Sequence, residues 1–161
     1  EQAALLRRDK DLLGRVVARC CEIKADVVAR DEREGGLRAI LNYGHTLGHA
    51  IEAVCGYGML LHGEAVAIGM VYANGVSRAC CGLAQADCER IRSLLTGLGL
   101  PVTLSEDPGW EALRTVMSAD KKAERRVPTF VLAERIGAVR FGCRVNEDVL
   151  SSAYGAMIAR E

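Results

Sequence analysis

The sequence predicts a mainly α-helical domain that carries one small β-hairpin, and three observations point to this fold class. Apolar residues recur every three or four positions over most of the chain, as in amphipathic helices. Two short strand-like runs, at 127–133 and 138–143, flank a Glu-Arg-Ile-Gly turn and predict a hairpin. With 161 residues and 50% hydrophobic content, the chain can form one domain with a proper core and is too short for two ordinary domains.

The helices are predicted from their apolar spacing and their caps. The first spans residues 3–24, and the polar segment 31–38 predicts an exposed turn before a new helix begins at Leu37. Asp107 and Pro108 supply an N-cap and a first-turn proline for a helix that ends near Ser118. The other helices are predicted at 41–54, 64–80, 86–98 and from Asn146 onward.

Composition excludes several classes of function. Lys+Arg and Asp+Glu both total 21, so no broad electrostatic attraction to nucleic acid or to an acidic membrane is expected. Aromatic residues make up 4%, too few for base-stacking platforms, and no apolar run is long enough to span a bilayer. The seven cysteines lack CxxC spacing, and most of them are interpreted as small buried apolar residues in a reducing compartment. We therefore expect a soluble, cytoplasmic protein.

The three histidines predict a metal site. His45 and His49 are four residues apart, so a helix projects both rings from one face, and a loop can fold His62 back toward them. Neutral imidazoles that converge in this way are zinc ligands. The alternative is that the three are unrelated structural or surface histidines, since HxxxH without the HExxH glutamate is only moderately specific.

Glycines stand beside these histidines at positions 44, 48 and 63. A glycine inside a helix costs about 1 kcal/mol relative to alanine. Its repeated use here predicts close approach of the backbone to a ligand or to another helix.

A second polar group lies upstream of the histidines and comprises Lys24, Glu34, Arg38 and Asn42. Arg38 and Asn42 precede the HxxxH pair at intervals that continue one helical face, which predicts a polar stripe facing a wet cavity. Arginine can grip a phosphate or carboxylate through two parallel hydrogen bonds, and lysine adds a point charge. Taken singly, Arg38 or Lys24 is more typical of a solvated surface charge, and the whole stripe is what favours a binding site.

Two further signals are weaker. Asp120-Lys121-Lys122 is typical of a solvated turn, and Glu64 suits the helix N-terminus that it occupies, although a role beside a metal is the alternative.

The segment KADVVARDEREGGLRAILNYGHTLGHAIEAVCGYGMLLHGEAVAIGM, at positions 24–70, closely resembles the signature region of 3-dehydroquinate synthases, above all in GHTLGHAIE and LHGE. DKK at 120–122 followed by a short hairpin resembles the family's later segment. The likeness covers nearly the whole chain, and it implies the C-terminal domain of the dehydroquinate synthase-like fold. Other sugar-phosphate cyclases share part of the pattern, and polyol dehydrogenases share the architecture more distantly.

The resemblance implies a lyase of the shikimate pathway, on the route to chorismate and the aromatic amino acids. Such an enzyme converts 3-deoxy-D-arabino-heptulosonate 7-phosphate into 3-dehydroquinate and phosphate with bound NAD and a divalent metal, zinc or cobalt. Carried over by position, His45 and His62 match metal ligands. The positions that match substrate-binding or catalytic residues are Lys24, Glu34, Arg38, Asn42, His49 and one of Lys121 and Lys122.

The chain also departs from the family. A complete synthase has an N-terminal α/β domain that binds NAD and supplies a glutamate as third metal ligand, and no glycine-rich element of that kind occurs here. Residues 1–161 are therefore expected to form the single C-terminal domain, with no cofactor-binding residues for NAD, and to be inactive in isolation. Expected partners are a sugar phosphate, the N-terminal domain of the same enzyme and, by resemblance, a second copy in a homodimer. The alternatives are a 2-deoxy-scyllo-inosose or 2-epi-valiolone synthase, a polyol dehydrogenase domain, or a non-catalytic helical domain.

Overall fold

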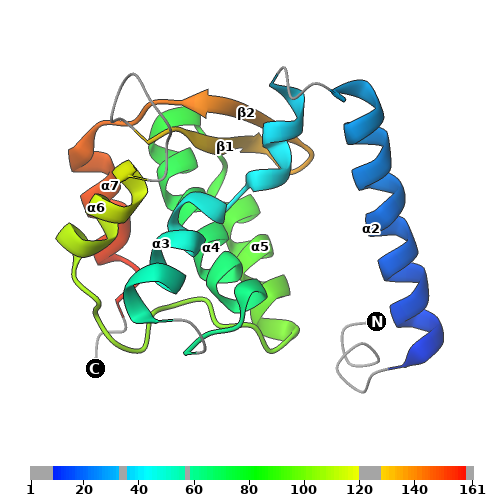
Figure 1. The fold of residues 1–161 in the computed structure, drawn as a ribbon, viewed down its shortest axis with the longest axis horizontal. Coiled ribbons are helices and arrows are strands. Elements are labelled where there is room, and N and C mark those ends of the chain that lie inside the picture. Colours follow the sequence, from blue (N-terminus) through cyan, green and yellow to red (C-terminus); the bar gives the residue numbers. More distant parts are fainter. Residues whose placement is uncertain (1–8, 33–35, 57–58, 120–127, 159–161) are drawn as a thin grey trace.

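The computed structural model describes residues 9–32, 36–56, 59–119 and 128–158, and it confirms a mainly helical chain with one antiparallel hairpin (Figure 1). The helices are α2 (Lys10–Arg30), the 3-10 helix η1 (Leu37–Asn42), α3 (His45–Cys55), α4 (His62–Cys81), α5 (Gln85–Gly97), α6 (Trp110–Ala119) and α7 (Glu147–Gly155). The strands are β1 (Phe130–Arg135) and β2 (Ala138–Cys143).

Helix α4 is the central element of the fold. It packs against α3, α5, α7 and strand β1, and residues 65–69 are all buried. Tyr72 is 1% exposed and donates a hydrogen bond to the Leu150 carbonyl oxygen at 3.2 Å, which ties α4 to α7. The apolar stretch at the start of α4 is therefore buried against other elements of this chain.

Glycines allow α3 and α4 to cross at backbone contact. A Cβ atom built on Gly69 would lie 2.0 Å from the Gly44 carbonyl oxygen, and one built on Gly48 would lie 3.2 Å from the Val66 Cα. Gly44 itself has φ +81°, a conformation that side chains rarely adopt. Close approach to another helix is thus confirmed for Gly44 and Gly48, whereas a Cβ on Gly63 would meet no atom within 4 Å.

The hairpin covers one end of the helices (Figure 1). Phe130 pairs with Cys143 and Arg135 with Ala138, so the predicted hairpin is confirmed, although β1 extends to Arg135, past its predicted end at Ala133. The buried Ser77 hydroxyl of α4 accepts a hydrogen bond from the Ala133 backbone N–H at 2.9 Å, so the hairpin is fastened to the central helix.

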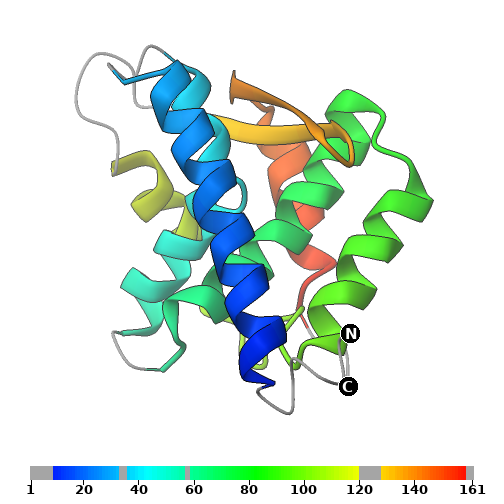
Figure 2. The same ribbon diagram turned by 90° about the vertical axis from the view of Figure 1, so that its right-hand side faces the viewer.

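Helix α2 lies to one side of this core (Figures 1 and 2). Asp9 caps its start by accepting a hydrogen bond from the Leu12 backbone N–H at 2.9 Å. The prediction that the helix ends near Lys24 is wrong, because the helix continues to Arg30 and buries Val27 in the added part. Arg30 and Asp26 also form an exposed ion pair of 2.9 Å there.

The predicted continuous helix through Leu37 and His49 is also wrong. Residues 37–42 form the 3-10 helix η1, Tyr43 has non-helical dihedral angles (φ −58°, ψ 123°), and Gly44 is left-handed. Helix α3 therefore starts anew at His45, where Gly44 packs against α4.

Two other expectations need correction. Helix α6 begins at Trp110, after the left-handed Gly109, and not at Pro108. All seven cysteines are free thiols, but three are exposed and four half-buried, so none is the fully buried residue that was expected.

Asn146 does cap α7, as predicted, by accepting a hydrogen bond from the Asp148 N–H at 2.9 Å. Among the described helices, none combines the length and apolar character required to cross a membrane.

Candidate metal centre

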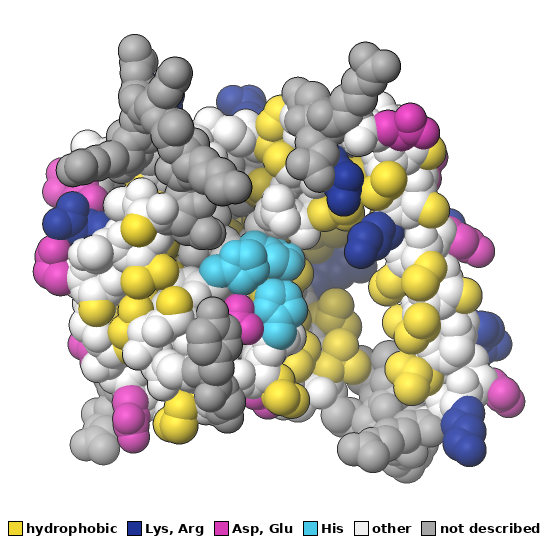
Figure 3. All heavy atoms as spheres, viewed as in Figure 1, with side chains coloured by type: hydrophobic (Ala, Val, Ile, Leu, Met, Phe, Trp, Pro, Cys, Tyr) yellow, Lys and Arg dark blue, Asp and Glu magenta, His cyan; other side chains and the backbone are white. Residues whose placement is uncertain are grey.

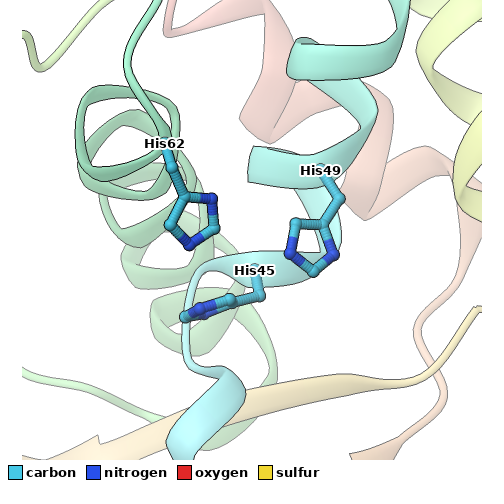
Figure 4. A group of neighbouring side chains, drawn as sticks. All are labelled: His45, His49 and His62. Atoms are coloured by element: carbon cyan, nitrogen blue, oxygen red, sulfur yellow. The ribbon is translucent and has the colours of Figure 1, made fainter.

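The three histidines of the chain converge in space (Figure 4). His45 and His49 project from the first turns of α3, and His62 is the first residue of α4. Their ring centroids are 5.4, 5.5 and 5.7 Å apart, and one nitrogen of each ring lies within 4.8 Å of the others. The clustering predicted from spacing is therefore confirmed.

The ring of His45 is held by the backbone that precedes it. Its Nδ1 lies 3.2 Å from the Tyr43 carbonyl oxygen, which can only accept, so Nδ1 carries the proton in that hydrogen bond. The neutral ring then has its lone pair on Nε2. Tyr43 is in turn anchored to α4, because its hydroxyl donates a hydrogen bond to Oδ1 of the buried Asn74.

The ring of His62 is held by a carboxylate. Its Nδ1 lies 3.2 Å from both Oε1 and Oε2 of Glu52 on α3. Glu64, the other carboxylate near His62, has a structural role instead. Its Oε2 accepts a hydrogen bond from the Leu61 N–H at 2.8 Å and so caps the start of α4. This contact supports the interpretation of Glu64 as a helix cap.

The electrostatic environment favours a neutral imidazole at His45. Partial burial lowers the pKa of His45 below its ordinary value, and the nearby rings of His49 and His62 lower it further. The Tyr43 carbonyl and Glu52 act in the opposite direction without reversing the shift. His45 thus offers an unprotonated nitrogen at neutral pH.

Three cavities adjoin the histidines. One, of about 450 Å³, is lined by Lys24, Arg38, Asn42 and His45. A second, of about 290 Å³, has Asn42, His45 and His49 in its wall, and a third, of about 460 Å³, has His49 and Glu52. Figure 3 shows the histidines exposed at the edge of the hollow between α2 and the core, with Lys and Arg side chains around that hollow. The predicted polar stripe therefore does not lie on one helix face. Arg38 and Asn42 come from η1, the histidines follow the bend at Gly44, and Lys24 comes from α2.

The remaining predicted site residues are not placed. Glu34, Lys121 and Lys122 lie outside the described residues. Their roles remain predictions.

Glu52 is a contact of the site that sequence reasoning missed. It stands three residues after His49 and seven after His45, on the same face of α3, and this interval was the available signal. The Tyr43 carbonyl had no signal, because it depends on the break in the helix at Gly44.

The donor set fits a divalent metal ion. Nitrogens bound to one tetrahedral zinc ion at 2.0–2.1 Å lie about 3.3 Å apart. One nitrogen of each ring lies within 4.8 Å of the others, so two or more of these rings can reach a single ion by side-chain rotation.

Comparison with known proteins identifies relatives of this chain. Residues 1–123 match the family model described as 3-dehydroquinate synthase C-terminal. The chain is 52% identical over 136 residues to the 3-dehydroquinate synthase of Geobacter sp. (strain M21), a match that covers 84% of this chain and 37% of that protein. It is 43% identical over 146 residues to the 3-dehydroquinate synthase of Thermodesulfovibrio yellowstonii, covering 91% of this chain and 41% of that protein. It thus spans less than half the length of these relatives.

Solved structures share the fold at lower sequence identity. ValA, a 2-epi-5-epi-valiolone synthase from Streptomyces hygroscopicus subsp. jinggangensis 5008 with NAD+ and Zn2+ bound, has a TM-score of 0.75 at 22% identity and covers 88% of this chain and 39% of its own. A 2-deoxy-scyllo-inosose synthase complexed with carbaglucose-6-phosphate, NAD+ and Co2+ has a TM-score of 0.72 at 24% identity. The match covers 86% of this chain and 40% of that protein's chain.

Proposed function

Because the chain belongs to the 3-dehydroquinate synthase family and matches its C-terminal region, we propose that it is the metal- and substrate-binding domain of a 3-dehydroquinate synthase. The proposed reaction is the conversion of 3-deoxy-D-arabino-heptulosonate 7-phosphate to 3-dehydroquinate and phosphate in the shikimate pathway. One observation carries the proposal: three imidazoles converge beside a cavity whose wall contains Lys24, Arg38 and Asn42.

His45 and His62 are the proposed metal ligands. Each has its Nδ1 engaged by an acceptor, so each presents Nε2 as the ligand atom. A bound zinc or cobalt ion would act as a Lewis acid on the hydroxyl and carbonyl oxygens of the substrate.

The cationic cavity suits an acidic sugar phosphate. The chain has zero formal charge, so an anion must be bound by a local group such as the pair Lys24 and Arg38. Asn42 adds an amide that can donate to or accept from a substrate hydroxyl. His49, on the rim of the neighbouring cavity, is proposed to contact the phosphate end and to exchange a proton as phosphate leaves.

The complete enzyme is proposed to be longer than this chain. NAD binding and a third metal ligand are assigned to the part of the relatives that the chain does not span. A homodimer and a cytoplasmic location belong to the same proposal, and seven free thiols suit a reducing compartment.

Turnover tests the proposal. The complete enzyme, supplied with NAD and Zn2+ or Co2+, should release phosphate from the heptulosonate 7-phosphate. It should not turn over an uncarboxylated sugar phosphate such as glucose 6-phosphate. Turnover of only the uncarboxylated sugar would assign the chain to the related cyclases, whose fold it shares at 22–24% identity.

Two groups of variants separate metal binding from substrate binding. His45→Ala and His62→Ala should lower Zn2+ affinity, because each removes a ligand. Arg38→Ala should raise KM and leave Zn2+ affinity unchanged, because Arg38 lines the cavity without belonging to the three-histidine cluster. Unchanged Zn2+ affinity in both histidine variants would refute the metal assignment.

A further inference from the structure

We propose that Glu52 is a positioning residue for the metal site, which fixes the tautomer and orientation of His62 so that Nε2 faces the ion. This inference rests on the proposed metal site. Glu52 does not belong to the three-histidine cluster, and it lines a cavity of about 460 Å³ with His49 rather than the cavity of Lys24 and Arg38. Its hydrogen-bond partner in the cluster is His62, so its proposed action is exerted through His62.

The geometry defines the hydrogen bond. Both carboxylate oxygens of Glu52 lie 3.2 Å from Nδ1 of His62. An ionised carboxylate can only accept, so Nδ1 must donate, and the lone pair of the neutral ring is then on Nε2. A histidine ligand commonly has its second nitrogen hydrogen-bonded to a carboxylate or carbonyl in this way.

The contact differs from an ordinary surface ion pair. The Glu52 side chain is only 18% exposed, whereas the His62 side chain is 56% exposed. The carboxylate is therefore fixed on the α3 side, and the exposed ring is the group that needs to be oriented. Glu52 also joins the two helices that supply the ligands, since it lies on α3 and His62 lies on α4.

The rings of His45 and His62 are oriented by two different kinds of acceptor. His45 is oriented by the Tyr43 carbonyl and His62 by Glu52. These are the same two residues that the resemblance assigns to the metal. Only the Glu52 contact uses a side chain, so it can be removed by substitution.

The tautomer of His62 is the first readout. In the full chain without metal, labelled with 15N-histidine and held above the pH at which imidazole protonates, two-bond 15N–1H couplings should report the Nδ1–H tautomer at His62. Glu52→Gln should retain this tautomer, because the amide oxygen still accepts from Nδ1. Glu52→Ala should populate the Nε2–H tautomer, and an unchanged Nδ1–H tautomer in that variant would overturn the inference.

Co2+ binding, followed by visible absorption, is the second readout. Affinity should fall about tenfold to a hundredfold in Glu52→Ala and by less in Glu52→Gln. Glu64→Gln is the matched control: it removes a carboxylate two residues from His62 that caps Leu61 instead, and Co2+ affinity should stay within about twofold.

The outcomes are distinguishable. Absence of Co2+ binding by the complete wild-type enzyme would refute the metal site, and the inference with it. If the wild type binds Co2+ and the Glu52→Ala and Glu64→Gln variants bind it with equal affinity, the role of Glu52 is refuted and the metal site is not.

Discussion

Replacing Gly69 by alanine tests whether the crossing of α3 and α4 sets the geometry of the metal site. The added Cβ would lie 2.0 Å from the Gly44 carbonyl oxygen and 3.0 Å from both the Gly44 carbonyl carbon and the Gly48 amide nitrogen. All three are backbone atoms, so no side-chain rotation relieves the overlap. Non-bonded heavy atoms pack at about 3.5 Å, so α3 must move away from α4 by about 1 Å or more.

That movement has an energetic and a chemical consequence. Overpacking of a core costs about 1–3 kcal/mol, and an overlap between two backbones should cost about 3 kcal/mol. For a chain of this size the loss corresponds to a fall in Tm of about 6–12 °C. His45 is adjacent to Gly44 while His62 is on α4, so the rings separate as well, and ligand distances tolerate only about 0.2 Å.

The assay is guanidinium unfolding followed by circular dichroism, together with Co2+ titration. Gly75→Ala is the matched control, because it is in the same helix and its added Cβ would lie 3.6 Å from the Ala153 Cβ, an ordinary contact. Gly75→Ala should be neutral or stabilising by up to about 1 kcal/mol. Equal stabilities and equal Co2+ affinities in the two variants would refute the claim that this crossing positions the site.

Three other predictions concern the core, pH and thiols. Leu113→Ala, at a side chain with 0% exposure, should cost about 2–5 kcal/mol in guanidinium unfolding, whereas Leu94→Ala, at 50% exposure, should cost about 0.5 kcal/mol or less; similar losses would contradict the assigned core. Burial raises the pKa of Tyr43 from 10.0 to about 12, so its contribution to stability is complete below pH 10 and is lost as pH rises toward 12. The wild type should therefore lose roughly 2 kcal/mol more than Tyr43→Phe over that range, and parallel unfolding profiles would count against this burial. Burial raises the pKa of the Cys55 thiol, whereas Cys80 is exposed, so Cys80 should be alkylated before Cys55. Mass spectrometry measures this order, and alkylation of Cys55 before Cys80 would be inconsistent with this structure.

Much of the site could be predicted from sequence because its signal is local. The i, i+4 spacing of His45 and His49 places two rings on one face wherever α3 begins, and the short connection to His62 limits where the third can lie. The hairpin and the Asn146 cap were likewise specified by neighbouring residues.

The break between η1 and α3 could not be predicted in this way. Apolar spacing continues through residues 37–54, so periodicity alone favours one helix. The break is imposed by Gly44, whose φ of +81° and contact with the Met70 backbone on α4 depend on tertiary packing. Arg38 and Asn42 line the cavity from η1, and not from the single continuous helix that was predicted. Lys24 lines the same cavity from α2.

Anomalous diffraction at the zinc edge, from crystals of the full chain soaked with Zn2+, tests the central claim most directly. We expect one dominant peak bonded to Nε2 of His45 and Nε2 of His62, with Glu52 still in contact with Nδ1 of His62. A zinc peak elsewhere on the chain, with the three rings turned away from one another, would contradict it.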